Sequence, residues 1–324
     1  MRDARSSSSL GASWQGTPPG PLPPGPSRGR IAAFVILYLL VVPFATMASE
    51  EAAAWLWPHL SDLLGPKPPA GSPFPGVESL VGGDQGLFAL RGLTGLLTIA
   101  LTTALFQQGL WHGGRSLWDL GLRRSRAGRD FLRGLFLGAG AMVLVYLVLR
   151  AAGWATWPAP APNGVVPRGW AVGLLAAGFI FLAAQEELIA RGFLFQSLAA
   201  GWGIPAAAVL QALLFGLAHL ANPYAGLAST VGTFAAGLLF AAACTRTGSL
   251  WLPTGIHAGW NLMEGPVLGL PVSGLKTARF LETKLEGPVA ATGGSFGPEA
   301  GWVSVAVLLL GTLWLARGSR SVRS

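Results

Sequence analysis

The chain has 324 residues, of which 52% are hydrophobic and only 11% are charged, and its formal net charge is +8. Soluble domains carry about 25% charged residues, so this composition excludes an ordinary soluble globular protein. The basic residues stand between apolar runs and not along one amphipathic face, which argues against a nucleic-acid-binding protein. They are typical of a membrane protein whose orientation they set.

The N-terminal region begins with a polar arm and a first apolar run. Residues 1–30 are rich in Ser, Gly and Pro, and we expect them to form a disordered arm. Arg28 and Arg30 then precede the apolar residues 31–47, a pattern that resembles a signal peptide with a cleavage site at residues 45–48. We favour an uncleaved first membrane helix, because many further spans follow.

The next part of the chain alternates between polar loops and apolar spans. Residues 50–86 contain several acidic side chains and are expected to form an acidic outer loop. The apolar runs 87–106 and 134–152 predict two more spans, separated by the strongly basic residues 111–133. A Pro-rich outer loop then extends to residue 168.

Residues 169–270 are almost entirely apolar and are long enough for about four crossings of about 20 residues each. Breaks are expected near residues 201–203, 222–223 and 246–248. A polar loop at 271–300 and a last span at 301–316 complete the pattern, followed by a basic tail. The predicted organisation is an arm (1–30), N-terminal helices with loops (31–168), a catalytic core (169–270) and a C-terminal region (271–324).

The spans sum to an all-α bundle of about eight transmembrane helices, and the charges give its orientation. An even number of crossings puts both termini on one side, together with the basic residues 111–133 and Arg246. The positive-inside rule makes that side the cytoplasm. The preference for Arg over Lys, with much Gly and Ala, favours a bacterial cell membrane. The single cysteine, Cys244, permits no disulfide within the chain and is expected to be a packed side chain.

Polar side chains within membrane helices are costly and usually functional, and the first group here is Glu186, Glu187 and Arg191. Adjacent helical residues point about 100° apart, so the two carboxylates cannot share one role. Glu187 and Arg191 are four residues apart on one face and can form a supporting ion pair. Glu186 has no local cation, which leaves it free to act as a general base.

Two further helices carry polar pairs of the same spacing. Phe215 and His219 lie one turn apart, and His257 and Asn261 form the second pair. A carboxylate and an imidazole can polarise a water molecule for attack on a carbonyl. A second imidazole and an amide N–H can stabilise the oxyanion, so with Glu186 the set suits peptide or ester hydrolysis.

This catalytic interpretation places requirements on the helix boundaries. Glu186 meets the two histidines only if its helix runs over about 177–200, and the other two over about 206–226 and 249–268. A transporter that uses the same charges would show paired repeats, which the sequence lacks. A catalytically silent scaffold or immunity-type protein stays open as the alternative.

The motifs Glu-Glu-x-x-x-Arg at 186–191, Phe-x-x-x-His at 215–219 and His-x-x-x-Asn at 257–261 resemble those of the CPBP family over residues 170–265. That family includes the type II CAAX prenyl proteases and the bacterial bacteriocin-processing and immunity homologues (Abi proteins). The resemblance implies an intramembrane endopeptidase that acts on a membrane-associated or lipidated protein or peptide.

The resemblance also implies roles for single residues. Glu186 would activate water with His219, while His257 and Asn261 would form the oxyanion site and Glu187 and Arg191 would support the architecture. The family has been described both as glutamate-dependent proteases and as metalloproteases. Glu186, His219 and His257 are therefore candidate Zn²⁺ ligands as well. The zincin pattern His-Glu-x-x-His is absent, so we favour a mechanism without a metal cofactor.

Overall fold

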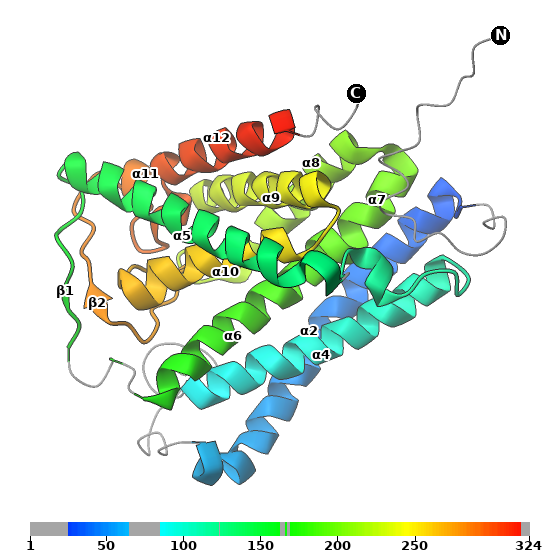
Figure 1. The fold of residues 1–324 in the computed structure, drawn as a ribbon, viewed down its shortest axis with the longest axis horizontal. Helices are drawn as coiled ribbons and strands as arrows, with labels where there is room; N and C mark the ends of the chain where they lie inside the picture. Colours follow the sequence, from blue (N-terminus) through cyan, green and yellow to red (C-terminus); the bar gives the residue numbers. More distant parts are fainter. Residues whose placement is uncertain (1–24, 65–84, 123, 163–165, 167–168, 319–324) are drawn as a thin grey trace.

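The computed structural model describes residues 25–64, 85–122, 124–162, 166 and 169–318. It is an all-α bundle (Figure 1), in which six helices are long and apolar enough to cross a membrane. With the shorter α10 and α12 they make eight helical units, as the sequence predicts. The units are α2 (Arg28–Leu64), α4 (Gln85–Leu110), α5 (Ala127–Ala151), the continuous α6, η3 and α7 (Trp170–Glu187, Leu188–Leu194, Phe195–Trp202), α8 with η4 (Ile204–Ala218, His219–Ala221), α9 (Leu227–Thr247), α10 with η5 (Trp251–Leu262, Met263–Val267) and α12 (Trp302–Gly318).

Large apolar side chains are exposed along the outside of the bundle. Isolated exposed apolar residues are normal on soluble proteins, but runs at helical spacing indicate contact with lipid. On α2 and α4 these runs are especially regular. Their exposed members include Ile36, Leu40, Phe44, Leu97, Leu101 and Leu105.

The predicted breaks in the long apolar segment are present, and glycine makes two of them. Gly203 (φ 84°) separates α7 from α8, and Gly248 (φ 63°) ends α9 in the left-handed conformation. Glycine adopts positive φ without steric cost, which explains why the chain turns at these two points. The third break follows Ala221, where Asn222 is extended before Pro223.

Three boundaries differ from the prediction, and one of them is the end of the helix that carries His219, at Ala221 and not at about 226. We expected an acidic loop from residue 50, but α2 continues to Leu64 and carries Glu50 and Glu51 on its exposed side. The segment after the apolar run is rich in Ala and Glu, which are strong helix formers and extend the helix. The rest of that loop, residues 65–84, lies outside the described residues. Likewise, α5 begins at Ala127, so Arg129 and Arg133 belong to a helix and not to the expected basic loop.

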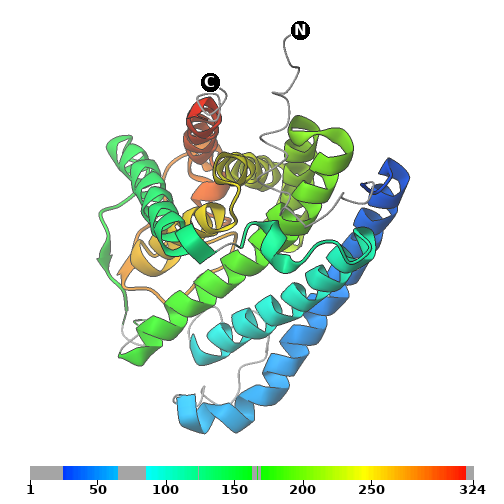
Figure 2. The same ribbon diagram turned by 45° about the vertical axis from the view of Figure 1, so that its right-hand side comes forward.

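Three arginines join helix ends at one end of the bundle. Arg28 Nε donates to Gly201 O at the end of α7 (2.8 Å), and Arg30 Nε donates to Leu110 O at the end of α4 (3.1 Å). Arg246 Nη1 donates to Leu315 O near the end of α12 (3.2 Å). Figure 2 shows the start of α2 and the end of α12 at this same end. The arrangement is the one that an even number of crossings requires; its orientation relative to the cytoplasm stays a prediction.

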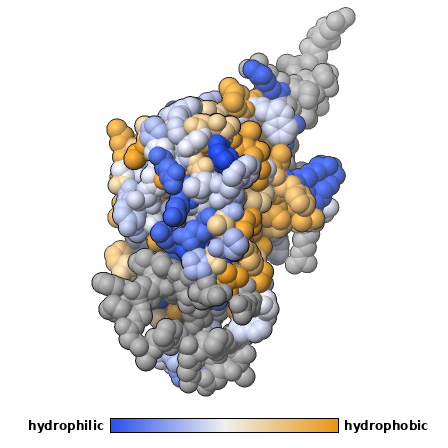
Figure 3. Space-filling model, turned by 90° about the vertical axis from the view of Figure 1, so that its left-hand side faces the viewer, coloured by the Kyte–Doolittle hydropathy of each residue, from blue (hydrophilic) through white to orange (hydrophobic). Residues whose placement is uncertain are grey.

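At the opposite end the expected polar loops contain several short elements. β1 (Ala159–Pro160) pairs antiparallel with β2 (Leu281–Glu282), so the segments after α5 and α10 meet there. The same region holds α11 (Val289–Thr292) and η6 (Pro298–Ala300), while η1 (Leu117–Leu120) and η2 (Arg124–Arg126) precede α5 at the arginine-rich end. In Figure 3 hydrophilic side chains gather in the middle of this face, bordered by apolar atoms.

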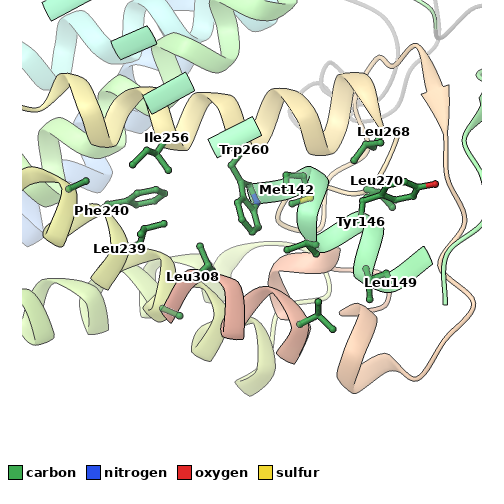
Figure 4. Packing of buried hydrophobic residues seen from close by; sticks show 14 of the residues in the cluster. Met142, Tyr146, Leu149, Leu239, Phe240, Ile256, Trp260, Leu268, Leu270 and Leu308 are labelled. Carbon is green, nitrogen blue, oxygen red and sulfur yellow. The ribbon is translucent and has the colours of Figure 1, made fainter. Parts of the chain in front are cut away.

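The largest buried cluster lies between α5, α9, α10 and α12. Figure 4 shows Trp260 of α10 between Phe240 of α9 and Met142 of α5, with Leu308 of α12 below. Phe215 of α8 also belongs to this cluster. Helices α5, α8, α9 and α12 therefore surround α10, with His257 and Asn261, in a packed interior.

Candidate active site

Glu186 lies at the middle of the longest helical unit within residues 169–270. The span Trp170–Trp202 comprises 33 residues, and Glu186 is equally far from both ends. Immediately after the acidic doublet the helix becomes a π-helix, η3, a feature that occurs frequently at functional sites. The observed helix contains the range 177–200 that the catalytic interpretation requires, and Glu186 lies at its middle.

Glu186 faces both histidines. Its Oε2 atom lies 3.9 Å from His219 Nε2 and 3.8 Å from His257 Nε2. These separations exceed a direct hydrogen bond, and polar groups at such distances are commonly bridged by water. Glu186 Oε2 is buried and has no hydrogen-bond partner among the described residues. The geometry therefore leaves an unsatisfied carboxylate oxygen between two imidazole nitrogens.

His219 ends α8 and is fixed by its own helix. Its Nδ1 lies 2.8 Å from Phe215 O, and since a carbonyl only accepts, Nδ1 carries the proton. In the neutral ring Nε2 then presents its lone pair toward Glu186. The Phe215 ring also packs on the imidazole, with centroids 4.6 Å apart. Within the Phe-x-x-x-His motif, Phe215 thus positions His219 through both its backbone carbonyl and its ring.

His257 is oriented by a residue of another helix. Its Nδ1 lies 3.0 Å from Glu187 Oε1, so the imidazole donates to the second carboxylate of the doublet. Its ring stacks on Phe240 of α9, with centroids 4.9 Å apart and planes 18° apart. Neither contact was anticipated from the sequence. Glu187 therefore supports His257 directly, in addition to its expected partner Arg191.

Arg191 is fully buried beneath the histidines. Its Nη1 lies 3.1 Å from Glu187 Oε1, and both side chains are 0% exposed, so the expected ion pair is present. The guanidinium lies over the rings of Phe215 (4.3 Å) and Phe240 (4.8 Å). Cation–π contacts of this kind stabilise a desolvated charge. Arg191 thereby holds together the elements that carry the two aromatic supports and the acidic doublet.

An open cavity adjoins the imidazoles, with a volume of about 390 Å³ including its mouth. His219, His257 and Asn261 line it, and Asn261 Oδ1 is buried without a hydrogen-bond partner in the described part of the chain. Glu186 does not line this cavity, although a quarter (25%) of its side chain is exposed. Ser273 and Glu299, which sequence reasoning did not single out, complete the lining.

Glycines bring α10 unusually close to α5. A Cβ atom on Gly138 of α5 would overlap Ile256 O, and one on Gly259 of α10 would overlap Leu135 O. Small residues at this spacing let helix backbones touch in membranes. The sequence alone gives no reason to assign α5 as the partner helix. The contact sets the position of α10 and therefore of His257 and Asn261.

Gly138→Ala is expected to destabilise the protein by about 1–3 kcal/mol, because the added methyl group meets a backbone carbonyl that cannot rotate away. Gly140→Ala is the matched control, since a Cβ there meets nothing within 4 Å. Thermal unfolding of both variants in detergent measures the difference. Equal midpoints for the two variants would show that the close approach does not determine stability.

Zinc is the cofactor that the sequence left open, and the donor geometry can be compared with what zinc needs. Two ligand atoms of a tetrahedral zinc site lie about 3.3 Å apart, given bond lengths of about 2.0–2.1 Å. Glu186 Oε2 lies 3.8 and 3.9 Å from the two imidazole nitrogens. Within the ranges that the structure describes, no group of three or more His, Cys, Asp or Glu residues is arranged to hold a metal ion. The side chains as placed do not fit zinc, and no step below passes through a metal.

Fold and site together define a polytopic helical membrane protein with a buried carboxylate–imidazole site. Residues 168–263 match the family model of the Type II CAAX prenyl endopeptidase Rce1-like proteins. No curated protein matches the chain. The resemblance deduced from the three motifs is thus confirmed over α6–α10. At the level of the family, the match indicates a CAAX-protease-like membrane peptidase with a membrane-associated protein substrate.

Proposed function

We propose that the protein is an intramembrane endopeptidase that hydrolyses a peptide bond with water activated by Glu186 and His219. The observation that carries the proposal is the unsatisfied Glu186 Oε2, which faces two imidazole nitrogens across a gap that one water molecule can bridge. The match of residues 168–263 to a family of endopeptidases supports it.

The charges of the site assign a role to each imidazole. Glu186 and Glu187 place two negative charges against the single guanidinium of Arg191, and a proton on His257 balances the excess. His257 then donates through Nδ1 to Glu187 and has an Nε2–H left to donate. In the proposed mechanism His219 accepts through Nε2, the nitrogen that its Nδ1–H···O contact with Phe215 leaves available.

The proposed reaction begins with the bridging water. Glu186 takes a proton from it while His219 orients it, and the oxygen attacks the scissile carbonyl carbon. His257 and Asn261 donate to the oxyanion that forms, in the low-dielectric interior where such hydrogen bonds are strong. The carbon–nitrogen bond then breaks, and the leaving amine takes up a proton.

The experiment uses the purified full-length chain in liposomes with a C-terminally prenylated peptide as the probe. We expect cleavage, with one oxygen from H₂¹⁸O in each new carboxyl group and no effect of a chelator. Cleavage that a chelator abolishes and added zinc restores would contradict the metal-free mechanism. A folded protein that cleaves neither prenylated nor membrane-embedded peptides would favour the silent scaffold or immunity-type protein.

A further inference from the structure

The wall of the cavity that faces the imidazoles comes from a segment that the family match does not cover. Ser273 and Glu299 line this wall, whereas the match ends at residue 263. Glycine allows the approach, because a Cβ on Gly232 of α9 would overlap the carbonyl oxygen of Glu299. The polar segment between η5 and α12 is therefore packed against α9 and contributes to the wall of the site.

Glu299 is held in one orientation. Its Oε2 accepts hydrogen bonds from the backbone N–H of Ser273 (2.8 Å) and from Ser273 Oγ (2.5 Å). Ser273 O in turn accepts from Asn222 Nδ2 (3.2 Å), and Asn222 follows the short helix that begins with His219. A continuous chain of hydrogen bonds and backbone thus links the Glu299 carboxyl to the element that carries one imidazole.

A second buried carboxyl lies beside the first. Glu264 of η5 is 0% exposed, its Oε2 accepts from Trp260 Nε1 (3.1 Å), and its carboxyl is close enough to interact with that of Glu299. No described group donates to Glu264 Oε1. Ionisation of both carboxyls is unfavourable, because like charges in neighbouring positions repel and Glu264 is fully buried. The arrangement therefore favours a pair that carries a proton over a pair of two carboxylates.

The groups that face Glu299 come from three elements. They are His219 of η4, His257 of α10 and Glu264 of η5. Burial raises the pKa of Glu299 above the usual value for glutamate, against the opposing effect of the Ser273 hydrogen bonds and the two imidazoles.

We propose that Glu299 is a further catalytic residue, the acid that protonates the leaving amine. The inference rests on the proposed function. As the carbon–nitrogen bond breaks, the Glu299 carboxyl gives its proton to the nitrogen and becomes a carboxylate. Glu186 releases the proton that it took from water to solvent at its exposed side, and Glu299 takes up a proton from the solvent of the cavity, which restores both groups. Base and acid would then act from different sides of the imidazole pair, because only Glu299 lines the cavity.

The leaving group provides a test. An amine needs a proton to leave, whereas p-nitrophenolate leaves as an anion. We expect Glu299→Gln to lose about 100-fold or more in cleavage of the prenylated peptide amide, a typical contribution of general acid catalysis. The same variant should hydrolyse the p-nitrophenyl ester of the peptide within a few-fold of wild type. Glu286→Gln, an exposed carboxylate on the same segment, is the matched control and should change neither rate.

The ratio of amide to ester turnover separates the outcomes. An unchanged ratio in Glu299→Gln, whether both rates persist or both fall, would overturn the assignment and leave Glu299 a structural residue. Where Glu299→Gln cannot be purified, Ser273→Ala removes one of the two hydrogen bonds and is judged by the same ratio, with a smaller shift expected. Glu186→Gln should lose cleavage of both the amide and the ester. Unchanged cleavage of both would contradict the proposed function itself, independently of Glu299.

Discussion

Glu187→Gln is expected to destabilise the protein by about 3–5 kcal/mol, the cost of leaving one member of a buried ion pair without its partner. Arg191 is 0% exposed and its only carboxylate contact within 4.0 Å, among the described residues, is Glu187 Oε1 at 3.1 Å. The surrounding rings of Phe215 and Phe240 contribute attraction but no formal charge. Denaturation of the purified variants, followed by tryptophan fluorescence, measures the loss.

A double variant separates the structural from the catalytic contribution of Glu187. Replacing both partners by apolar residues, as in Glu187→Leu with Arg191→Met, removes the unpaired charge and should recover much of the stability. It should not recover peptide cleavage, since His257 Nδ1 loses its acceptor at 3.0 Å. Recovery of both stability and cleavage would show that the orientation of His257 does not depend on Glu187.

The partly exposed pair Arg279–Glu282 serves as the control. Its atoms are 3.4 Å apart and the Glu282 side chain is 32% exposed. Partly solvated pairs contribute little, so Glu282→Gln should change stability by less than about 1 kcal/mol. A loss in Glu187→Gln no larger than in Glu282→Gln would contradict the structural role assigned to the buried pair.

The sequence was sufficient for features that depend on local patterns. Apolar runs of membrane length predicted the helical units, and Gly203 and Gly248 marked two of their ends. The i,i+4 spacing predicted the pair of Glu187 and Arg191. The catalytic interpretation required helix boundaries that let Glu186 meet both histidines, and the structure places Glu186 Oε2 within 4 Å of both.

Features that depend on distant contacts could not be predicted. Glu187 and His257 are 70 positions apart, and neither position shows locally which partner it will meet. Phe240 lies in a uniformly apolar helix, where nothing distinguishes a ring that stacks on an imidazole from one that fills the core. The acidic residues of α2 were assigned to a loop, because their charge was weighed above the helix propensity of their neighbours.

Glu299 could not be predicted from the sequence for a different reason. It stands in a segment rich in Gly and Pro that reads as a polar loop, and the sequence offers no periodicity there. Only the packed structure shows that η6 turns this carboxyl into the cavity with the imidazoles. A segment outside the three motifs can therefore complete the site, and variants confined to the matched region would miss it.

The central claim is that the bridging water is activated by the first carboxylate of the doublet. Glu186→Gln keeps the size of the side chain and removes its ability to accept a proton. Because Glu186 Oε2 has no hydrogen-bond partner among the described residues, the variant should fold and express like wild type. Glu50→Gln, on the exposed side of α2, is the control for charge removal elsewhere in the chain.

The most direct measurement is the single-turnover rate of prenylated-peptide cleavage by Glu186→Gln in liposomes, beside wild type and Glu50→Gln. The account predicts a loss of about 10²–10⁴-fold in Glu186→Gln, the range of a general base, with unchanged thermal stability and no loss in the control. His219→Ala should show a comparable loss, since His219 Nε2 faces the same oxygen at 3.9 Å. Wild-type cleavage rates in both Glu186→Gln and His219→Ala would contradict the account.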